Sequence, residues 1–195
     1  ITSPVDILNK DDFERELEEL DSLRAKADAI NSKLTKSISE KYQENPAYYD
    51  SFSQRIRAAL DQYKERVISE SEYLSKMREI MEDYHTGKST VTYPKAIQED
   101  VHAQAFYGVL SAVFSSAPEA EVSPDFAAEI SLEIKNIIAA HSQVDWTNNQ
   151  TIHDRIAQDI DDLFYRYERE QGLKLSFDTI DKVIENVKTV ALRRF

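Results

Sequence analysis

The sequence predicts an all-α protein: a multi-helix domain in which a long N-terminal helical arm or hairpin precedes a C-terminal helical bundle. Apolar residues recur at steps of three and four along most of the chain, the spacing of the buried face of a helix. The 195 residues include only three glycines and five prolines, and 31% are charged, a composition typical of long helices. No segment alternates apolar and polar residues over the length of a strand.

The first part of the chain predicts a tail and then long charged helices. Residues 1–10 are expected to form a linker tail, and residues 11–92 an arm or connecting region. Two of its helices are expected over residues 47–65 and 69–84. Ser69 and Glu72 have the spacing of a capping box at the start of the second.

The longest apolar stripe of this region runs from Phe13 to Ile38. It predicts one helix of about seven turns at 3.6 residues per turn. Asp11 or Asp12 is expected to cap its start. Pro46 ends it, because the residue before a proline is disfavoured in the helical conformation.

Residues 93–195 are expected to form a compact helical bundle. The clearest break before it is the segment 85–90, after which Pro94 is expected to start a helix. Residues 115–122 are predicted to be a loop. The following Ser123-Pro124-Asp125 combines a capping residue, a first-turn proline and an acid, which is the expected opening of a helix.

Residues 144–195 predict a helical hairpin entered through the only tryptophan of the chain. Gly172 lies where a left-handed residue would end the first helix, and Ser176 can cap the second. We expect Trp146 to be a structural anchor with a buried face and a hydrogen-bonded N–H, and Asp145 to be a cap. The stripe of the first helix comprises Ile152, Ile156, Ile160, Leu163, Phe164 and Tyr167.

Composition excludes several classes of function. There is no cysteine, hence no disulfide framework and no thiol chemistry. The formal net charge of −12 argues against a generic nucleic-acid binder. No apolar run reaches the length of a membrane span, and no secretory signal is visible, so we expect a cytoplasmic protein with no membrane partner. The chain does not begin with methionine, and we expect one structural unit cut from a longer chain.

Two motifs suggest chemistry, but the sequence around each argues against it. Gly87-Lys88-Ser89 matches the end of a phosphate-binding loop, but the earlier glycine that the motif needs is Glu82, and a helix turn is favoured. Asp125, Glu133 and Lys135 match the residue types of a metal-dependent nuclease, with carboxylates to hold the metal. Their helical spacing turns Glu133 and Lys135 in different directions. The four histidines lack metal-ligand spacing, and no metal site is predicted.

Basic and aromatic residues are the candidates for DNA or partner contacts, because arginine, lysine and tyrosine are frequent at such surfaces. The competing interpretation is ordinary charge pairing on solvated helices. The candidates are Lys33, Lys36, Tyr48, Tyr49, Arg55, Arg57, Lys64, Arg66, Lys88, Arg193 and Arg194. Among them, Tyr48, Tyr49, Arg55, Arg57 and Lys64 are the leading ones.

Four segments resemble a known family. They are the helix 103–110, the helix through 134–138, the segment Val144-Asp145-Trp146, and residues 152–160 with the final helix after them. From about Tyr93 onward the chain resembles the C-terminal region of the R (motor and restriction) subunit of type I restriction–modification enzymes. The earlier helices would then be the variable connecting region of that family.

The resemblance implies a non-catalytic domain of a large DNA-translocating subunit. ATP and Mg²⁺ would serve the parent subunit, and this fragment would hold no cofactor. Its partners would be the methyltransferase and specificity subunits of the restriction complex, with duplex DNA as an accessory contact. Two alternatives stay open: a free-standing helical protein–protein interaction module, and a small metal-dependent nuclease built on Asp125, Glu133 and Lys135.

Overall fold

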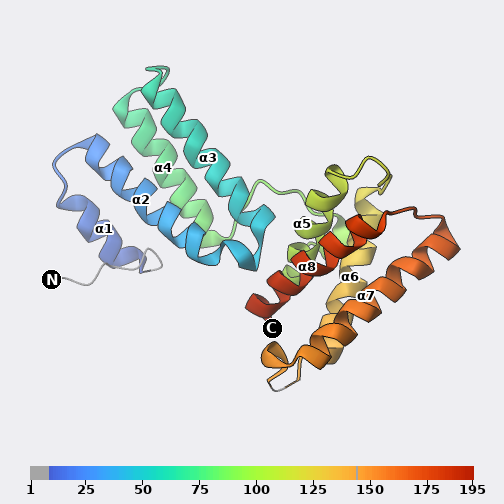
Figure 1. Ribbon diagram of the computed structural model, residues 1–195. Coiled ribbons are helices and arrows are strands. Elements are labelled where there is room, and N and C mark those ends of the chain that lie inside the picture. Colours follow the sequence, from blue (N-terminus) through green and yellow to red (C-terminus); the bar gives the residue numbers. More distant parts are fainter. Residues whose placement is uncertain (1–8, 144) are drawn as a thin grey trace. The chain divides into compact units, whose positions relative to one another are not determined.

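The computed structural model describes residues 9–143 and 145–195, and these residues form an all-α protein, as predicted (Figure 1). No described residue belongs to a strand. The α-helices of the described residues are α1 (Lys10–Glu18), α2 (Leu23–Lys41), α3 (Pro46–Lys64), α4 (Glu70–Thr86), α5 (Val101–Ser115), α6 (Pro124–His141), α7 (Gln150–Gln171) and α8 (Phe177–Arg194). The described residues also form the short 3-10 helices η1 (Tyr42–Glu44), η2 (Lys95–Ile97) and η3 (Trp146–Asn148).

The chain divides into two compact units. The first unit comprises the described residues up to Tyr42 and residues 48–91, and so contains α1, α2, most of α3, and α4. The second unit comprises residues 43–47 and 92–195 and contains α5 to α8. Most of the predicted tail over residues 1–10 lies outside the described residues, and Lys10 is already the first residue of α1.

The core of the first unit is built from the apolar stripes of its four helices. Helix α2 packs along α4, where Leu34 and Met77 are fully buried. The rings of Tyr63 and Tyr73 stack with their centroids 4.9 Å apart. Burial of one such large apolar side chain contributes about 2 kcal/mol, so the aligned stripes hold these helices together.

The prediction of one continuous helix over residues 13–38 is wrong. A turn between α1 and α2 interrupts it. The Ser22 hydroxyl accepts a hydrogen bond from the Ala25 N–H at 3.0 Å and caps α2. Before it, the Leu20 N–H donates to the Leu17 carbonyl at 3.2 Å. Apolar spacing does not reveal this turn, because both helices bury their stripes in the same core.

Two predicted helix starts are displaced. Asp11 and Asp12 lie within the first turn of α1, and the residue before that helix is Asn9. Pro94 precedes the short helix η2 and does not start the long one. Helix α5 begins after Asp100, whose carboxylate accepts a backbone N–H at 2.9 Å.

The other helix ends follow the local sequence signals. The Ser69 N–H donates to the Glu72 carboxylate at 2.7 Å and the Glu72 N–H to the Ser69 hydroxyl at 3.3 Å, so the predicted capping box is present. Gly87 and Gly172 adopt φ angles of 73° and 72°, the left-handed conformation that ends α4 and α7. The serines that cap α6 and α8 are Ser123 and Ser176.

The second unit is a four-helix bundle. Helix α5 packs against α6 and α8, and α7 packs against the same two helices, so the four surround one core. Phe106, Ile134, Ile160 and Val187, one from each helix, are almost completely buried there. At Gly108 a side-chain carbon would lie 2.7 Å from the Ala47 Cβ, so glycine allows residues 43–47 to approach α5 closely.

Trp146 and Asp145 differ in what they contribute. Trp146 is 3% exposed within the core of the second unit, and its ring meets that of His153 edge-on at 5.8 Å. Its Nε1 has no acceptor among the described residues, contrary to the expected hydrogen bond. Asp145 does not act as the predicted capping side chain; it has a φ of 62° and makes no side-chain cap hydrogen bond. Val144 lies outside the described residues.

Candidate nucleic-acid and partner contact surfaces

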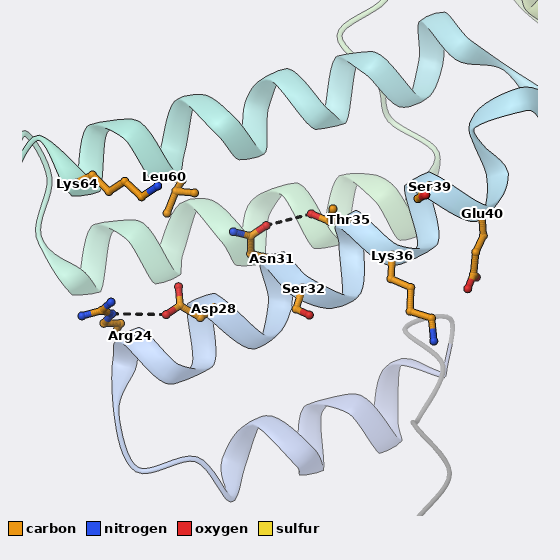
Figure 2. A pocket seen from close by; sticks show the side chains of 10 residues that line it. All are labelled: Arg24, Asp28, Asn31, Ser32, Thr35, Lys36, Ser39, Glu40, Leu60 and Lys64. Carbon is orange, nitrogen blue, oxygen red and sulfur yellow. Dashed lines mark hydrogen bonds and ion pairs between the residues drawn. The ribbon is translucent and has the colours of Figure 1, made fainter.

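The first unit has an open surface groove of about 740 Å³ between α2 and α3 (Figure 2). We call it the α2–α3 groove. Helix α3 contributes Leu60 and Lys64, and α2 contributes the rest. The lining residues are Arg24, Asp28, Asn31, Ser32, Thr35, Lys36, Ser39, Glu40, Leu60 and Lys64.

Two of its cations are available to a ligand. Arg24 pairs with Asp28 at 3.5 Å, one helical turn away. Lys36 and Lys64 are exposed, and no ion pair in the described part of the chain involves either. Figure 2 shows Lys64 and Arg24 toward one end of the α2–α3 groove and Lys36 toward the other. The hydroxyl of Thr35 donates to the Asn31 side chain at 3.1 Å between them.

A second hollow adjoins this groove and shares Arg24 and Lys64 with it. We call it the Arg66 hollow. It is lined by Arg24, Tyr63, Lys64, Arg66, Ile68, Ser69 and Glu70. Arg66 has a φ of 59° and is exposed, with no ion pair among the described residues. The structure thus brings three predicted contact residues, Lys36, Lys64 and Arg66, onto two adjoining hollows.

The predicted tyrosine contacts are packing residues. Tyr49 is buried, and the rings of Tyr48 and Phe52 meet edge-on at 5.1 Å. The rings of Tyr48 and Tyr49 also meet edge-on, at the same distance. Both lie on the core side of α3, because the apolar stripe of the helix includes them, and a contact role for either stays a prediction.

Two predicted basic contacts are engaged in ion pairs. The Arg55 guanidinium donates to the Asp83 carboxylate at 2.6 Å. The Lys33 ammonium lies 3.2 Å from the Glu16 carboxylate and 5.4 Å from the centre of the Phe13 ring. Both cations join helices of the first unit, so charge pairing, the competing interpretation, holds for them.

The remaining predicted cations divide into two groups. Arg57 and Lys88 are exposed but line neither hollow. Arg194 donates to the backbone carbonyls of Glu44 and Val101, at 3.0 and 2.9 Å. Arg193 donates to the Gln43 side chain at 3.2 Å. The last two arginines therefore fasten residues 43–47 within the second unit, a role that their spacing at a helix end did not indicate.

Two exposed aromatic residues of the second unit were not predicted as contacts. Phe177, the first residue of α8, is 85% exposed, and Tyr165 on α7 is 64% exposed. The signal was present in the sequence: Tyr165 lies outside the stripe through Phe164 and Tyr167, and Phe177 directly follows the cap. Exposed aromatic side chains of this kind are frequent at protein interfaces.

Two of the predicted nuclease residues, Glu133 and Lys135, pair with different neighbours. Lys135 donates to Asp100 at 2.8 Å. Glu133 accepts from the Tyr167 hydroxyl at 2.8 Å and also pairs with Arg166. Burial, and then the Glu133 carboxylate, raise the pKa of Tyr167. No group of three histidine, aspartate or glutamate side chains in the described residues is placed to hold a metal ion.

The other motif is a structural turn. Gly87 ends α4 in a left-handed conformation and the Lys88 N–H donates to the Asp83 carbonyl at 2.8 Å. The helix that precedes it replaces the strand that a phosphate-binding loop requires. No α-helix within the described residues is long and apolar enough to cross a lipid bilayer.

The described residues thus form an all-α protein of two helical units. When the chain is compared with known protein families, the family described as "Type I restriction enzyme HindI endonuclease subunit-like, C-terminal" matches residues 2–191. The chain belongs to this family. The match covers both units, whereas the sequence resemblance began only at about Tyr93. No curated protein and no solved structure matches the chain.

Proposed function

We propose that this chain is a non-catalytic domain that joins a type I restriction endonuclease subunit to the methyltransferase and specificity subunits, with an accessory contact to duplex DNA. The single observation that supports it is the family match over residues 2–191. Because the match extends over both units, we assign both to the same role. This complex would act in the cytoplasm, where its DNA lies.

The proposed absence of catalysis rests on the arrangement of the polar residues. Glu133 and Lys135 are each paired with a different neighbour, Arg166 and Asp100. A metal-dependent nuclease needs its carboxylates to converge on one ion. ATP and Mg²⁺ are therefore assigned to the parent subunit, whose translocation and cleavage activities this domain would support by positioning it.

Exposed aromatic residues are the first candidates for the protein contact. Phe177 and Tyr165 expose most of their surface, and aromatic residues contribute a large share of the energy of typical interfaces. Both belong to the second unit. We assign the protein contact to this unit and the DNA contact to the first, where Lys36, Lys64 and Arg66 line two adjoining hollows.

The test is a binding measurement with purified methyltransferase–specificity core. The 195-residue chain is immobilised, and the core is titrated over it. We expect saturable binding with a Kd at or below about 1 µM, equivalent to about 8 kcal/mol. Phe177→Ser and Tyr165→Ser should each weaken it about tenfold or more. Leu23→Ser, which alters an exposed apolar residue of the first unit, is the control. Absence of binding at micromolar concentration would reject the assembly role.

A further inference from the structure

The charge of the two adjoining hollows is opposite to that of the chain. The whole sequence has 36 acidic and 24 basic side chains. The linings of the α2–α3 groove and the Arg66 hollow together contain four cations, Arg24, Lys36, Lys64 and Arg66, and three carboxylates. One of these carboxylates, Asp28, is paired with Arg24. The two hollows therefore carry a small net positive charge, although the net charge of the whole chain is negative, and this charge would attract an anion.

The uncharged residues of the α2–α3 groove suit a phosphate backbone. Ser32 and Ser39 present hydroxyl donors on the α2 side, whereas the Thr35 hydroxyl donates to the Asn31 side chain. Such side chains, together with arginine and lysine, make most protein contacts to DNA phosphates. At 1.5 Å per residue, Arg24 and Lys36 are separated by about 18 Å along α2. With one phosphate per 3.4 Å along each strand, this length corresponds to roughly five nucleotide steps.

Arg66 occupies a position where glycine is the usual residue. The Val67 N–H donates to the Gln62 carbonyl at 2.8 Å and the Arg66 N–H to the Tyr63 carbonyl at 3.0 Å. This is the Schellman pattern at a helix end, and it places Arg66 in the left-handed conformation. A side chain at this position is unfavourable for the fold, and this one is exposed beside Lys64.

From the cations, the donors and the strained arginine, we propose that the α2–α3 groove and the Arg66 hollow form one binding site for the phosphate backbone of duplex DNA. Lys36, Lys64 and Arg66 provide the charge, and the Ser32 and Ser39 hydroxyls donate hydrogen bonds to phosphate oxygens. The inference rests on the DNA contact of the proposed function and assigns it to particular residues of the first unit.

The experiment measures fluorescence anisotropy of a labelled 20-base-pair duplex titrated with the 195-residue chain at several KCl concentrations. The variant is Lys36→Ala/Lys64→Ala. The matched control is Lys174→Ala/Lys182→Ala, which removes the same charge from two exposed lysines of the second unit. Each lost phosphate contact lowers the slope of log K against log salt by about 0.9. We expect the groove variant to lower it by about two and to weaken binding about tenfold at 50 mM KCl, with little change in the control.

The variant Arg66→Gly distinguishes a direct loss of DNA binding from a loss caused by unfolding. Glycine removes the charge and also relieves the left-handed strain, so we expect DNA affinity to fall several-fold while the unfolding temperature rises by about 2–4 °C. A variant that binds less because it is unfolded would show the opposite thermal change. Arg66→Lys keeps the charge and should retain most of the affinity.

Three results would overturn the site. Equal losses in the two double-lysine variants would mean that DNA responds only to net charge. Unchanged DNA affinity in Arg66→Gly would show that Arg66 is not part of the site. Failure of the parent chain to bind duplex DNA at 50 mM KCl would reject the accessory DNA contact as well. The assembly role would be untouched by any of them, because the binding measurement with the methyltransferase–specificity core tests it separately.

Discussion

The Arg55 guanidinium donates to the Asp83 carboxylate at 2.6 Å, joining α3 to α4 across 28 residues of sequence. Glu79 lies 3.6 Å from the same guanidinium, and the Phe52 ring centre lies 5.8 Å from it. The side chains of Arg55 and Asp83 are 21% and 25% exposed. An arginine held in this way stabilises the fold of the first unit. The neighbouring carboxylates neutralise its charge, so it is expected to contribute little to DNA binding.

Arg55→Ala should therefore affect stability and leave DNA binding nearly unchanged. Removal of a partly buried, charge-assisted hydrogen bond costs about 1–2 kcal/mol, measurable as a lower denaturation midpoint in urea. DNA affinity should change no more than in a variant that removes one exposed charge, such as Lys174→Ala. A large loss of DNA affinity in Arg55→Ala, with unchanged stability, would indicate that Arg55 contacts DNA.

The capping box of α4 predicts that replacing serine by alanine has opposite effects on stability at two positions of this helix. Ser69→Ala removes the acceptor of the Glu72 N–H and should destabilise the first unit by about 1 kcal/mol. Ser75→Ala replaces an exposed serine inside the same helix, where alanine has the higher helix propensity, and should stabilise slightly. Chemical denaturation of both variants checks the pair; equal effects would contradict the capping assignment.

Glu119 predicts a pH dependence of stability in the second unit. Its carboxylate accepts from the hydroxyls of Ser176 and Thr179, both at 2.8 Å. Hydrogen bonds from the backbone, and then from these hydroxyls, lower the pKa of Glu119 from 4.5 to about 2. Because the folded state lowers this pKa, the stabilisation is complete above pH 4.5 and is lost as the pH falls toward 2.

The measurement for Glu119 is the difference in unfolding free energy between the parent and Glu119→Gln as a function of pH. The parent should be the more stable protein at pH 7, and the difference should shrink progressively below pH 4.5. Asp178→Asn, which alters an exposed acid in the first turn of α8, gives the comparison for a carboxylate outside this cluster. A difference between parent and Glu119→Gln that is independent of pH from 2 to 7 would refute the linkage.

The close packing at Gly108 predicts that its replacement by alanine destabilises the protein, although the same change usually stabilises a helix. Alanine usually stabilises a helix interior relative to glycine, by about 1 kcal/mol. Here the new Cβ would lie 2.7 Å from the Ala47 Cβ, so Gly108→Ala should destabilise by about 1–3 kcal/mol. The double variant Gly108→Ala/Ala47→Gly removes the clash and should recover most of the loss. If the two single effects simply add in the double-mutant cycle, the close approach is not the cause.

Local sequence signals located most helices because the interactions that define a helix and its ends lie within four residues. Ser69 with Glu72, Ser123 with Pro124, and Gly172 each act on their own turn, and the structure has them as predicted. The family resemblance was equally a property of the sequence, carried by the segments around Trp146, and the family match confirms it.

The sequence by itself therefore determined the helical class, most of the helix bounds and the family of this protein. Only the tertiary structure decided which cations are available: Arg55 and Arg194 are engaged by groups 28 and 150 residues away, whereas Lys36 and Lys64 line one groove between two helices. Helical periodicity assigns a side chain to a face of its own helix. Its partner depends on which other helix packs against that face, and that choice is made by the burial of the whole core.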